Sequence, residues 1–588
     1  MKSKELRKLF LDFFEKRGHK IVKPTSLVSE GDKTVLFNVA GMQQFKPYYT
    51  REKDPIKDNH IGSDEPLGSQ KIANIQPCIR TIDIDEVGDK SHLTVFEMLG
   101  NFAFNKSYFK EEAINLAYDF IQEGLKLNMD DIYVTVYKGD DDVLMDQESY
   151  DLWKKAGLKE SQIGLGEKED NFWGPVGNTG ICGPCSEIYF KGIEIWTIVF
   201  NQYLKKEDGS LELLENVGVD GGAGFERQLM AVNFGSDFEG KSIYDTDVFF
   251  DQIQFLKEKS LNYIEKSARI VSDHFKASVF LIANGVLPAN VDRGYVLRRL
   301  IRRIVRHLKQ LEINDNIFEQ MLVNLQNVYG DFYTEIMDSK TILDVINKEV
   351  NKFNLTLEKG LKELNLLFKE IADKKIDGCK AFYIYETFGF PIELIKEEAE
   401  SRGFVVDEDG FNDEFEKHKE ISRAGLEGKF GGHNLDSLNI ETDSYKIRTK
   451  LHTATHLLLK ALREVLGEDV FQKGSDINDE RLRFDFTFGR KLTEEELLKI
   501  QKIVNEKIQE GLIVSFKEMK TEDALKMGYL GSFMSKYPEQ VTTYDIGGWS
   551  KEICAGPHVN NTKEIGELKI IKEEASSQGI RRIKAVVK

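Results

Sequence analysis

The periodicity of the apolar residues changes twice along this chain, and that change constrains the fold more than any other feature. Up to about residue 235, short β-type runs such as TVLFNVAG, IYVTVYKG and IEIWTIVFNQYL alternate with glycine-rich turns, which predicts a mixed α/β domain on a mostly antiparallel sheet. From about 246 to 425, long amphipathic stretches predict a helical domain. The remainder mixes helical segments with β-rich pieces such as RLRFDFTF and GELKII, which predicts a third, α+β domain.

We therefore expect three domains, because 588 residues exceed the size at which one core keeps growing. The glycine-rich stretch GLEGKFGGHNLDS at 425–437 is typical of a linker. The N-terminal segment has apolar residues at helical spacing, interrupted by acidic residues, and predicts an ordinary helix and not a targeting peptide. The predicted domains are 1–245, 246–430 and 438–588.

Composition limits the binding partners and the cellular compartment that this chain can have. Apolar residues make up 41% and charged residues 31%, the balance of a globular protein. Five cysteines are too few for a disulfide framework and favour the cytoplasm, and no apolar run is long enough to span a membrane. Because 81 basic minus 99 acidic residues leaves −18, a nucleic acid would have to be bound by a local basic patch.

One such patch is the segment RGYVLRRLIRRIVRHLK at 293–309. A helix would turn its apolar residues inward and its arginines outward. Outward arginines either contact phosphates or pair with acidic neighbours, and the segment alone does not decide between these.

Three segments of the first domain could together hold a nucleotide. LFNVAGMQQFKPYY at 36–49 predicts an apolar strand that ends in a small-residue turn, and Arg80 and the Phe96-Glu97-Met98 run are predicted on two strands joined by a loop. In GVDGGAGFER at 218–227, glycines allow a ligand to approach before a helix opens at Glu226 and Arg227. Fixed guanidinium groups suit a triphosphate, so Arg80 and Arg227 are the candidates.

These segments resemble motifs 1, 2 and 3 of the class II aminoacyl-tRNA synthetases. FNVAGMQQFK, TVFEMLGNFAF, ICGPCSEIYF and EIWTIVFNQY are similar to alanyl-tRNA synthetases in particular, and the resemblance covers essentially the whole chain. It implies a multidomain α+β fold with a six-stranded antiparallel sheet and flanking helices, a helical tRNA-recognition domain and an α+β zinc editing domain. The implied activity is attachment of L-alanine to tRNA-Ala through an alanyl-adenylate, with ATP and Mg²⁺.

The resemblance also assigns residues. Arg80 would bind the α-phosphate of ATP and Arg227 the γ-phosphate, Asp220 would pair with the ammonium of alanine, and Val199 would limit the depth of the pocket. Thr197 stands where the family usually has Asn. The implied ATP contacts are Arg80, Phe96, Met98, Trp173, Ile195, Trp196, Thr197, Gly224 and Arg227, and the implied alanine contacts are Trp173, Thr197, Val199 and Asp220.

In the family, helices after the catalytic domain read a G·U pair in the acceptor stem. The positions that match are Arg298, Arg302, Arg306, Lys309 and Glu386. Two of them depart from the usual residues, because Lys309 replaces an Asn and Glu386 an Asp. The CxxC formed by Cys182 and Cys185 has no second ligand pair nearby, so we interpret it as structural and not as a zinc or redox motif.

The third domain carries a metal pattern. His452 and His456 are four residues apart, on one face of a predicted helix, and Cys554 and His558 form a CxxxH. Either pair alone is more often buried structure, but the two together supply three imidazoles and one thiolate, the tetrahedral set that Zn²⁺ prefers. This resembles the editing domain shared by alanyl- and threonyl-tRNA synthetases, and further residues that could line its site are Thr455, Gln472, Arg483 and Asp485.

The editing domain implies hydrolysis of Ser- and Gly-tRNA, which a small apolar pocket cannot exclude by binding alone. Zinc could either activate water there or position the terminal adenosine. The usual C-terminal part of the family is not matched, so we expect a compact form that is monomeric. The rival interpretations are a trans-acting editing hydrolase, a tRNA-binding regulator with an inactive synthetase-like domain, and a serine or glycine ligase.

Overall fold

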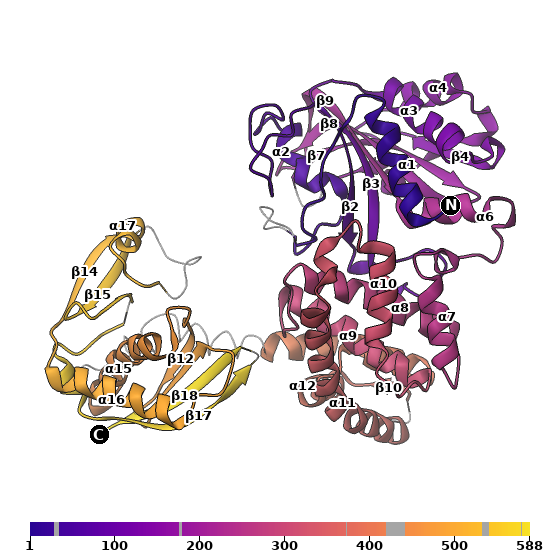
Figure 1. The fold of residues 1–588 in the computed structure, drawn as a ribbon. Coiled ribbons are helices and arrows are strands. Elements are labelled where there is room, and N and C mark those ends of the chain that lie inside the picture. Colours follow the sequence, from indigo (N-terminus) through magenta and orange to yellow (C-terminus); the bar gives the residue numbers. More distant parts are fainter. Residues whose placement is uncertain are drawn as a thin grey trace. The chain divides into compact units, whose positions relative to one another are not determined.

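In a computed structural model of the chain the residues fall into two compact units (Figure 1). The first comprises residues 1–376 and 383–406, and the second 377–382 and 407–588. The predicted boundary at 245 lies inside the first unit and stays a prediction, and the predicted linker at 425–437 lies outside the described residues. The described residues are 1–28, 35–175, 179–371, 373–418, 442–531, 540–554, 556–577 and 579–588.

A nine-stranded sheet organises the first unit, in the order β1-β2-β3-β9-β8-β7-β4-β5, with β6 paired to β7. The six strands from β2 to β4 in this order are antiparallel, as expected, but β1 joins β2 and β5 joins β4 in parallel. The expectation of six antiparallel strands therefore describes the centre of the sheet and not its edges. The strands are β1 (Lys20–Ile21), β2 (Lys71–Ile79), β3 (Val95–Ala103), β4 (Ile132–Tyr137), β5 (Ile163–Gly166), β6 (Phe172–Trp173), β7 (Gly180–Phe190), β8 (Ile193–Lys205) and β9 (Leu211–Gly224).

Helices flank this sheet, and the N-terminal segment is helical as predicted, with its apolar face buried against β2. The strand predicted at 36–40 does not form, apart from one bridge between Val28 and Phe37. The Gln43 side chain accepts hydrogen bonds from the backbone N–H groups of Val39 and Ala40 and caps a short 3-10 helix, Gly41–Phe45. The α-helices of this part are α1 (Ser3–Glu15), α2 (Lys46–Tyr49), α3 (Lys110–Asp119), α4 (Gln147–Ala156), α5 (Lys168–Asn171) and α6 (Phe225–Phe234).

The rest of the first unit is helical, as predicted, and it braces the sheet through buried ion pairs. Lys276 on α8 donates to Glu226 on α6 at 2.7 Å, and Arg7 on α1 binds the Glu97 carboxylate of β3 at 2.7 and 2.8 Å. These bonds fix the helix that opens at Glu226 against the central strands. The elements are α7 (Phe250–Lys259), α8 (Glu265–Ala283), α9 (Asp292–Gln310), α10 (Phe318–Tyr329), α11 (Ser339–Glu370), β10 (Lys375–Ile376), α12 (Gly378–Phe388, with residues in both units), α13 (Ile392–Glu400) and β11 (Val405–Val406).

The second unit is the predicted α+β region, with helix α15 packed on a four-stranded sheet of order β12-β13-β18-β17. A second sheet has the order β14-β15-β16. Its elements are α15 (Asp443–Leu466), β12 (Gln472–Ile477), β13 (Leu482–Thr487), α16 (Glu494–Glu510), β14 (Val514–Lys520), α17 (Thr521–Lys526), β15 (Gln540–Ile546), β16 (Ser550–Ile553), β17 (Leu568–Ser577) and β18 (Ile580–Val587). In the described ranges, no helix is both long and apolar enough to cross a membrane.

Candidate active site and metal centre

A cavity of about 540 Å³ lies on the central strands of the large sheet. Strands β3, β7, β8 and β9, the start of α6 and the loop after β2 contribute to its wall. Segments far apart in the sequence, from Val39 to Arg227, therefore meet here. The sequence-predicted residues that line the cavity are Arg80, Phe96, Met98, Trp173, Thr197, Val199, Asp220, Gly224 and Arg227.

Asp220 on β9 contributes a buried carboxyl group to this cavity. It lies opposite Val199 of β8 and Phe102 of β3, and only 6% of its surface is exposed. Burial raises the pKa of its carboxyl from 3.8 to about 7. A buried carboxylate is costly unless a cation pairs with it, so a ligand that carries an ammonium group would be held at this point.

Arg227 and Thr197 are joined by a residue that sequence reasoning missed. The Arg227 guanidinium donates to Glu194 Oε2 at 2.8 Å, and the Thr197 hydroxyl donates to Glu194 Oε1 at 2.7 Å. Glu194 thereby fixes the guanidinium at the cavity wall. Strict strand alternation from Thr197 would place Glu194 on the other face, so the spacing of the residues does not indicate its place in the cavity.

A β-bulge explains why Glu194 faces the cavity and why the side chains of Ile195 and Trp196 do not. Between β7 and β8 the register shifts, so that Trp196 pairs with Ile188 and Glu194 pairs with Tyr189, leaving Ile195 as the extra residue. Ile195 and Trp196 are both 1% exposed and pack in the core, where Trp196 contacts aromatic rings of α1. Neither side chain lines the cavity, because the bulge turns both toward the core, and the expected contact of these residues with ATP stays a prediction.

A second carboxylate that sequence reasoning missed, Glu187 on β7, lies beside Glu194 and lines the same cavity. Burial, with a further contribution from the negative charge of Glu194, raises the pKa of Glu187 to about 7, although the Tyr189 hydroxyl that donates to it opposes this shift. Two carboxylates on paired strands offer oxygen ligands to a hard divalent cation such as Mg²⁺.

Arg80 enters the cavity directly after β2. Its backbone N–H donates to the carbonyl of Thr94, and its guanidinium carbon lies 5.1 Å from the centre of the Phe96 ring. Thr94 is itself held by Asp273 of α8, which accepts from the Thr94 backbone N–H at 2.9 Å and from its hydroxyl at 2.6 Å. Helix α8 therefore positions Thr94, and through the hydrogen bond between Thr94 and Arg80 it positions the residue that follows β2.

The basic helix α9 differs from the sequence expectation. Most of its arginines do not face outward, because acidic side chains of α11, α13 and the loop after β2 cover them. Arg302 donates to Glu349 at 2.7 and 2.8 Å, Arg303 pairs with Asp85 and Glu397, and the pairs of Arg298 with Glu349 and Arg306 with Glu398 complete the set. The side chains of Arg298, Arg299, Arg302, Arg303 and Arg306 are only 2–13% exposed.

Of the residues expected to read the acceptor stem, two are exposed. Lys309 at the end of α9 has a side chain that is 47% exposed and lies 3.7 Å from Glu358, and Glu386 on α12 is exposed. Cys182 and Cys185 are both buried within β7, in agreement with their structural interpretation, and burial raises the pKa of Cys182 to about 11.

In the second unit the four predicted metal ligands meet. One ligand atom from each of His452, His456, Cys554 and His558 lies within 4.8 Å of the others. Although burial alone would raise the pKa of the Cys554 thiol, His452 and His456 lower it well below 9. The described residues thus contain a compact set of three imidazoles and one thiolate.

The other ring nitrogen of each histidine lies near an oxygen atom, and for His456 this contact is an ion pair and not a hydrogen bond. His452 Nδ1 lies 3.1 Å from the Pro557 carbonyl, and His558 Nδ1 lies 3.2 Å from the Thr453 hydroxyl. His456 Nδ1 lies 2.5 Å from Glu552, a buried carboxylate that the sequence did not indicate. Nε2 of His456 and of His558 is buried without a hydrogen-bond partner. Orphaned Nε2 atoms around a thiolate fit a tetrahedral zinc ion.

Comparisons with known proteins agree with this arrangement. The model of the family described as tRNA synthetases class II (A) matches residues 5–465, and that of the threonyl and alanyl tRNA synthetase second additional domain matches 541–584. An alanine–tRNA ligase of Borrelia hermsii is 41% identical over 617 residues, covering 100% of both chains. One of Treponema denticola is 40% identical, covering 99% of this chain and 98% of its own, and one of a Thermoanaerobacter species is 34% identical, covering 99% and 79%.

Proposed function

This chain belongs to the alanine–tRNA ligases among the class II tRNA synthetases, and from this premise we propose that the sheet cavity is where it activates L-alanine with ATP and charges tRNA-Ala. The observation that carries the assignment is Asp220, a buried carboxylate whose raised pKa marks it as lacking a cation. The α-ammonium of alanine supplies that cation. Val199, directly opposite Asp220 on β8, closes the space in which a larger side chain would lie.

ATP would lie between the two cavity arginines. Arg80 binds the α-phosphate and Arg227 the γ-phosphate, because a guanidinium matches phosphate oxygens with two parallel donors and keeps its charge at any pH. The Phe96 ring and Met98 provide the apolar contact for adenine, and Gly224 lets the backbone come close. Glu187 and Glu194 are the residues that would hold Mg²⁺, which when bound neutralises phosphate charge.

The chemistry then needs positioning more than covalent help from the protein. A carboxylate oxygen of alanine attacks the α-phosphorus, the bond to the β-phosphate oxygen breaks, and pyrophosphate leaves with the electron pair. In the second step a ribose hydroxyl of the tRNA attacks the alanyl carbonyl, the bond from that carbon to the phosphate oxygen breaks, and AMP leaves with the electron pair while the hydroxyl proton passes to its phosphate or to water. Asp220 holds the ammonium through both steps, and Arg80 stabilises the charge on the α-phosphate.

The direct test is ATP–pyrophosphate exchange with saturating alanine, glycine or serine. Alanine is expected to support the fastest exchange. Faster exchange with serine or glycine would overturn the assignment of Val199 and Asp220 as the alanine pocket.

We expect Asp220→Asn to abolish most alanine binding without weakening the fold. Loss of one partner from a buried charge pair costs about 3 kcal/mol, which is roughly 100-fold in the KM for alanine. The folded protein itself loses a costly buried carboxyl and keeps the side-chain volume, so its unfolding midpoint should not fall. Exchange kinetics and a thermal melt of the same preparation measure both effects, and a variant with the KM of the parent would refute the role of Asp220.

The same carboxyl predicts a pH dependence. Its folded pKa of about 7 exceeds the ordinary pKa of 3.8 for this group, so without ligand the folded state holds the extra proton and loses stability as the pH rises from about 4 to 7. Alanine binds the ionised form, so its KM should rise as the pH falls below about 7. Glu187 has a pKa of about 7 as well, and parallel titrations of Asp220→Asn and Glu187→Gln separate the two groups.

The tRNA contacts of the helical region also remain proposals. Lys309 and Glu386 are suited to touch the acceptor stem because both are exposed. For Arg298, Arg302 and Arg306 to contact phosphates, their ion pairs with Glu349 and Glu398 would have to open. Without tRNA these arginines hold α11 and α13 against α9.

For the second unit, we propose that zinc held by His452, His456, Cys554 and His558 serves hydrolysis of wrongly charged Ser- and Gly-tRNA. The buried Nε2 atoms without partners and the lowered pKa of the Cys554 thiol support such an ion. Serine differs from alanine by one hydroxyl and glycine by one methyl group, differences that binding alone discriminates weakly. A second hydrolytic site therefore has a physical reason to exist in this chain.

Glu552 is expected to tune that site. Because it holds Nδ1 of His456 at 2.5 Å, Glu552→Gln should orient the ring less firmly and weaken zinc binding by about 10- to 100-fold. Competition against a zinc chelator measures the affinity. Glu564→Gln is the control, because Glu564 caps a short helix with the Asn561 backbone and is outside the cluster. Equal affinities for Glu552→Gln and the parent would contradict this role.

A further inference from the structure

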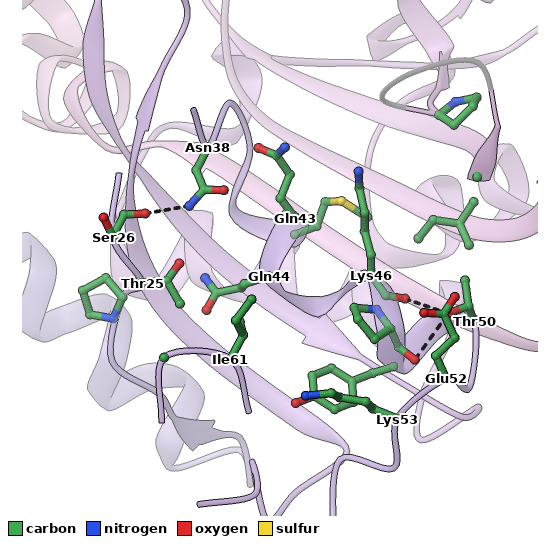
Figure 2. A pocket seen from close by; sticks show the side chains of 18 of the residues that line it. Thr25, Ser26, Asn38, Gln43, Gln44, Lys46, Thr50, Glu52, Lys53 and Ile61 are labelled. Atoms are coloured by element: carbon green, nitrogen blue, oxygen red, sulfur yellow. Dashed lines mark hydrogen bonds between the residues drawn. The ribbon is translucent and has the colours of Figure 1, made fainter. Parts of the chain in front are cut away.

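A second cavity, of about 590 Å³, adjoins the first in the same unit (Figure 2). Trp173 and Pro175 line both, so the two spaces meet at this pair. The volume lies in the range of small-ligand sites, which is about 300–1,000 Å³. ATP and alanine are accounted for by the charges of the first cavity, and the reaction has a third substrate whose reacting end must reach the same place.

The lining of the second cavity mixes apolar side chains with polar groups, and its two lysines outnumber its one carboxylate, Glu52. Its amides and hydroxyls can bond base edges, and its two lysines can neutralise phosphate. Several of these groups already have structural duties, since the Gln44 amide bonds Gln76 and Asn38 donates to the Ser26 carbonyl. The polar residues used in the argument are Thr25, Asn38, Gln43, Gln44, Lys46 and Lys53.

Gln43 differs from the other amides. It is only 6% exposed, and its Oε1 accepts from the backbone N–H groups of Val39 and Ala40, the latter at 3.2 Å. Its Nε2 is buried without a hydrogen-bond partner, although buried donors are nearly always paired. Figure 2 shows Gln43 and Lys46 extending in the same direction from the helical segment 41–49. An acceptor on a ligand in this cavity would satisfy the orphaned donor.

We propose that this cavity binds an unpaired nucleotide of the acceptor end of the tRNA, with Gln43 Nε2 donating to a base or phosphate oxygen. Single-stranded RNA is recognised by hydrogen bonds to exposed base edges and by aromatic stacking, and amides, lysines and Trp173 provide these contacts at the entrance to the first cavity. The inference rests on the proposed function, because it places the third substrate of that reaction.

Gln43→Glu tests the proposed donor. The carboxylate keeps an oxygen for the backbone N–H groups of Val39 and Ala40, but it removes the N–H₂ group and adds negative charge. Alanine-dependent pyrophosphate exchange, measured without tRNA, should stay within about twofold of the parent. Single-turnover transfer of the alanyl group to tRNA should slow by about tenfold or more, the cost of leaving a buried group unpaired.

Lys46→Gln is a second variant for the case that Gln43→Glu does not fold. It removes a positive charge from the same cavity, and Lys46 is only half-buried. Lys57→Gln, at a lysine outside the cavity that pairs with Asp54, is the matched control. The parent should also bind intact tRNA more tightly than tRNA trimmed of its last three nucleotides, and Gln43→Glu or Lys46→Gln should reduce that difference.

Transfer rates equal to the parent in both variants would overturn the inference, as would exchange that falls in parallel with transfer, because the cavity would then serve a small substrate. A parent protein that supports no alanine-dependent exchange would overturn the proposed function itself. The two failures are therefore distinguishable in one set of measurements.

Discussion

Replacing Arg80 by glutamine is expected to slow alanine-dependent pyrophosphate exchange by about a thousandfold, the effect of removing an arginine that stabilises charge during phosphoryl transfer. The guanidinium lies at the wall of the cavity over the Phe96 ring. Glutamine retains a donor but neither the charge nor the forked geometry. Because Arg80 is only half-buried, its loss should leave the unfolding midpoint within a few degrees of the parent.

Two further variants make this result specific. Arg80→Lys keeps the charge without the paired donors, so its exchange rate should fall between the parent and Arg80→Gln. Arg51→Gln removes an exposed arginine of the same unit that pairs with Glu215, and it should exchange normally. If Arg80→Gln retains more than a tenth of the parental rate, Arg80 does not bind the reacting phosphate.

Replacing Cys554 by alanine is expected to remove zinc from the second unit. The thiolate would be the anionic ligand of a zinc ion held by the cluster, and its loss should weaken zinc binding by more than the roughly 100-fold that the loss of an outer-shell partner costs. Hydrolysis of Ser-tRNA should fall with the zinc content, whereas pyrophosphate exchange should not change. Metal analysis, a deacylation assay and exchange on one preparation measure all three.

Cys379→Ala is the matched control, because Cys379 is an exposed cysteine outside the cluster. It should retain zinc and deacylation. A Cys554→Ala protein that deacylates Ser-tRNA at the parental rate would show that zinc at this cluster does not serve hydrolysis. Equal zinc content in Cys554→Ala and the parent would show that the thiolate is not a ligand.

Local spacing was enough to predict the residues that surround both sites. His452 and His456 lie on one helix face because they are four residues apart, and Phe96 and Met98 line the cavity together because alternate strand residues share a face. The change from strand periodicity to helical periodicity likewise predicted the sheet, the helical region and the α+β region. These features depend on the spacing of residues within one helix or strand, and this spacing can be read from the sequence.

Ion pairs and hydrogen bonds between distant segments could not be predicted from the sequence. The helical pattern predicted that the arginines of α9 face outward. In the structure, Glu349, Glu397 and Glu398 of other helices cover Arg302, Arg303 and Arg306. The predicted strand at 36–40 was lost because the Gln43 oxygen takes two of its backbone donors. Both outcomes depend on partners that propensity does not reveal.

The sequence by itself determined the family, the four residues of the His/Cys cluster and most of the cavity wall, because these follow from residue type and spacing within single strands and helices. The tertiary structure alone decided that Glu194 faces the cavity while Ile195 and Trp196 face the core, since one extra residue in β8 reverses the alternation. It also decided that Glu552 holds His456 and that Gln43 Nε2 is left without a partner. Hydrogen bonding across the fold requires atoms to meet in space, and only packing brings them together.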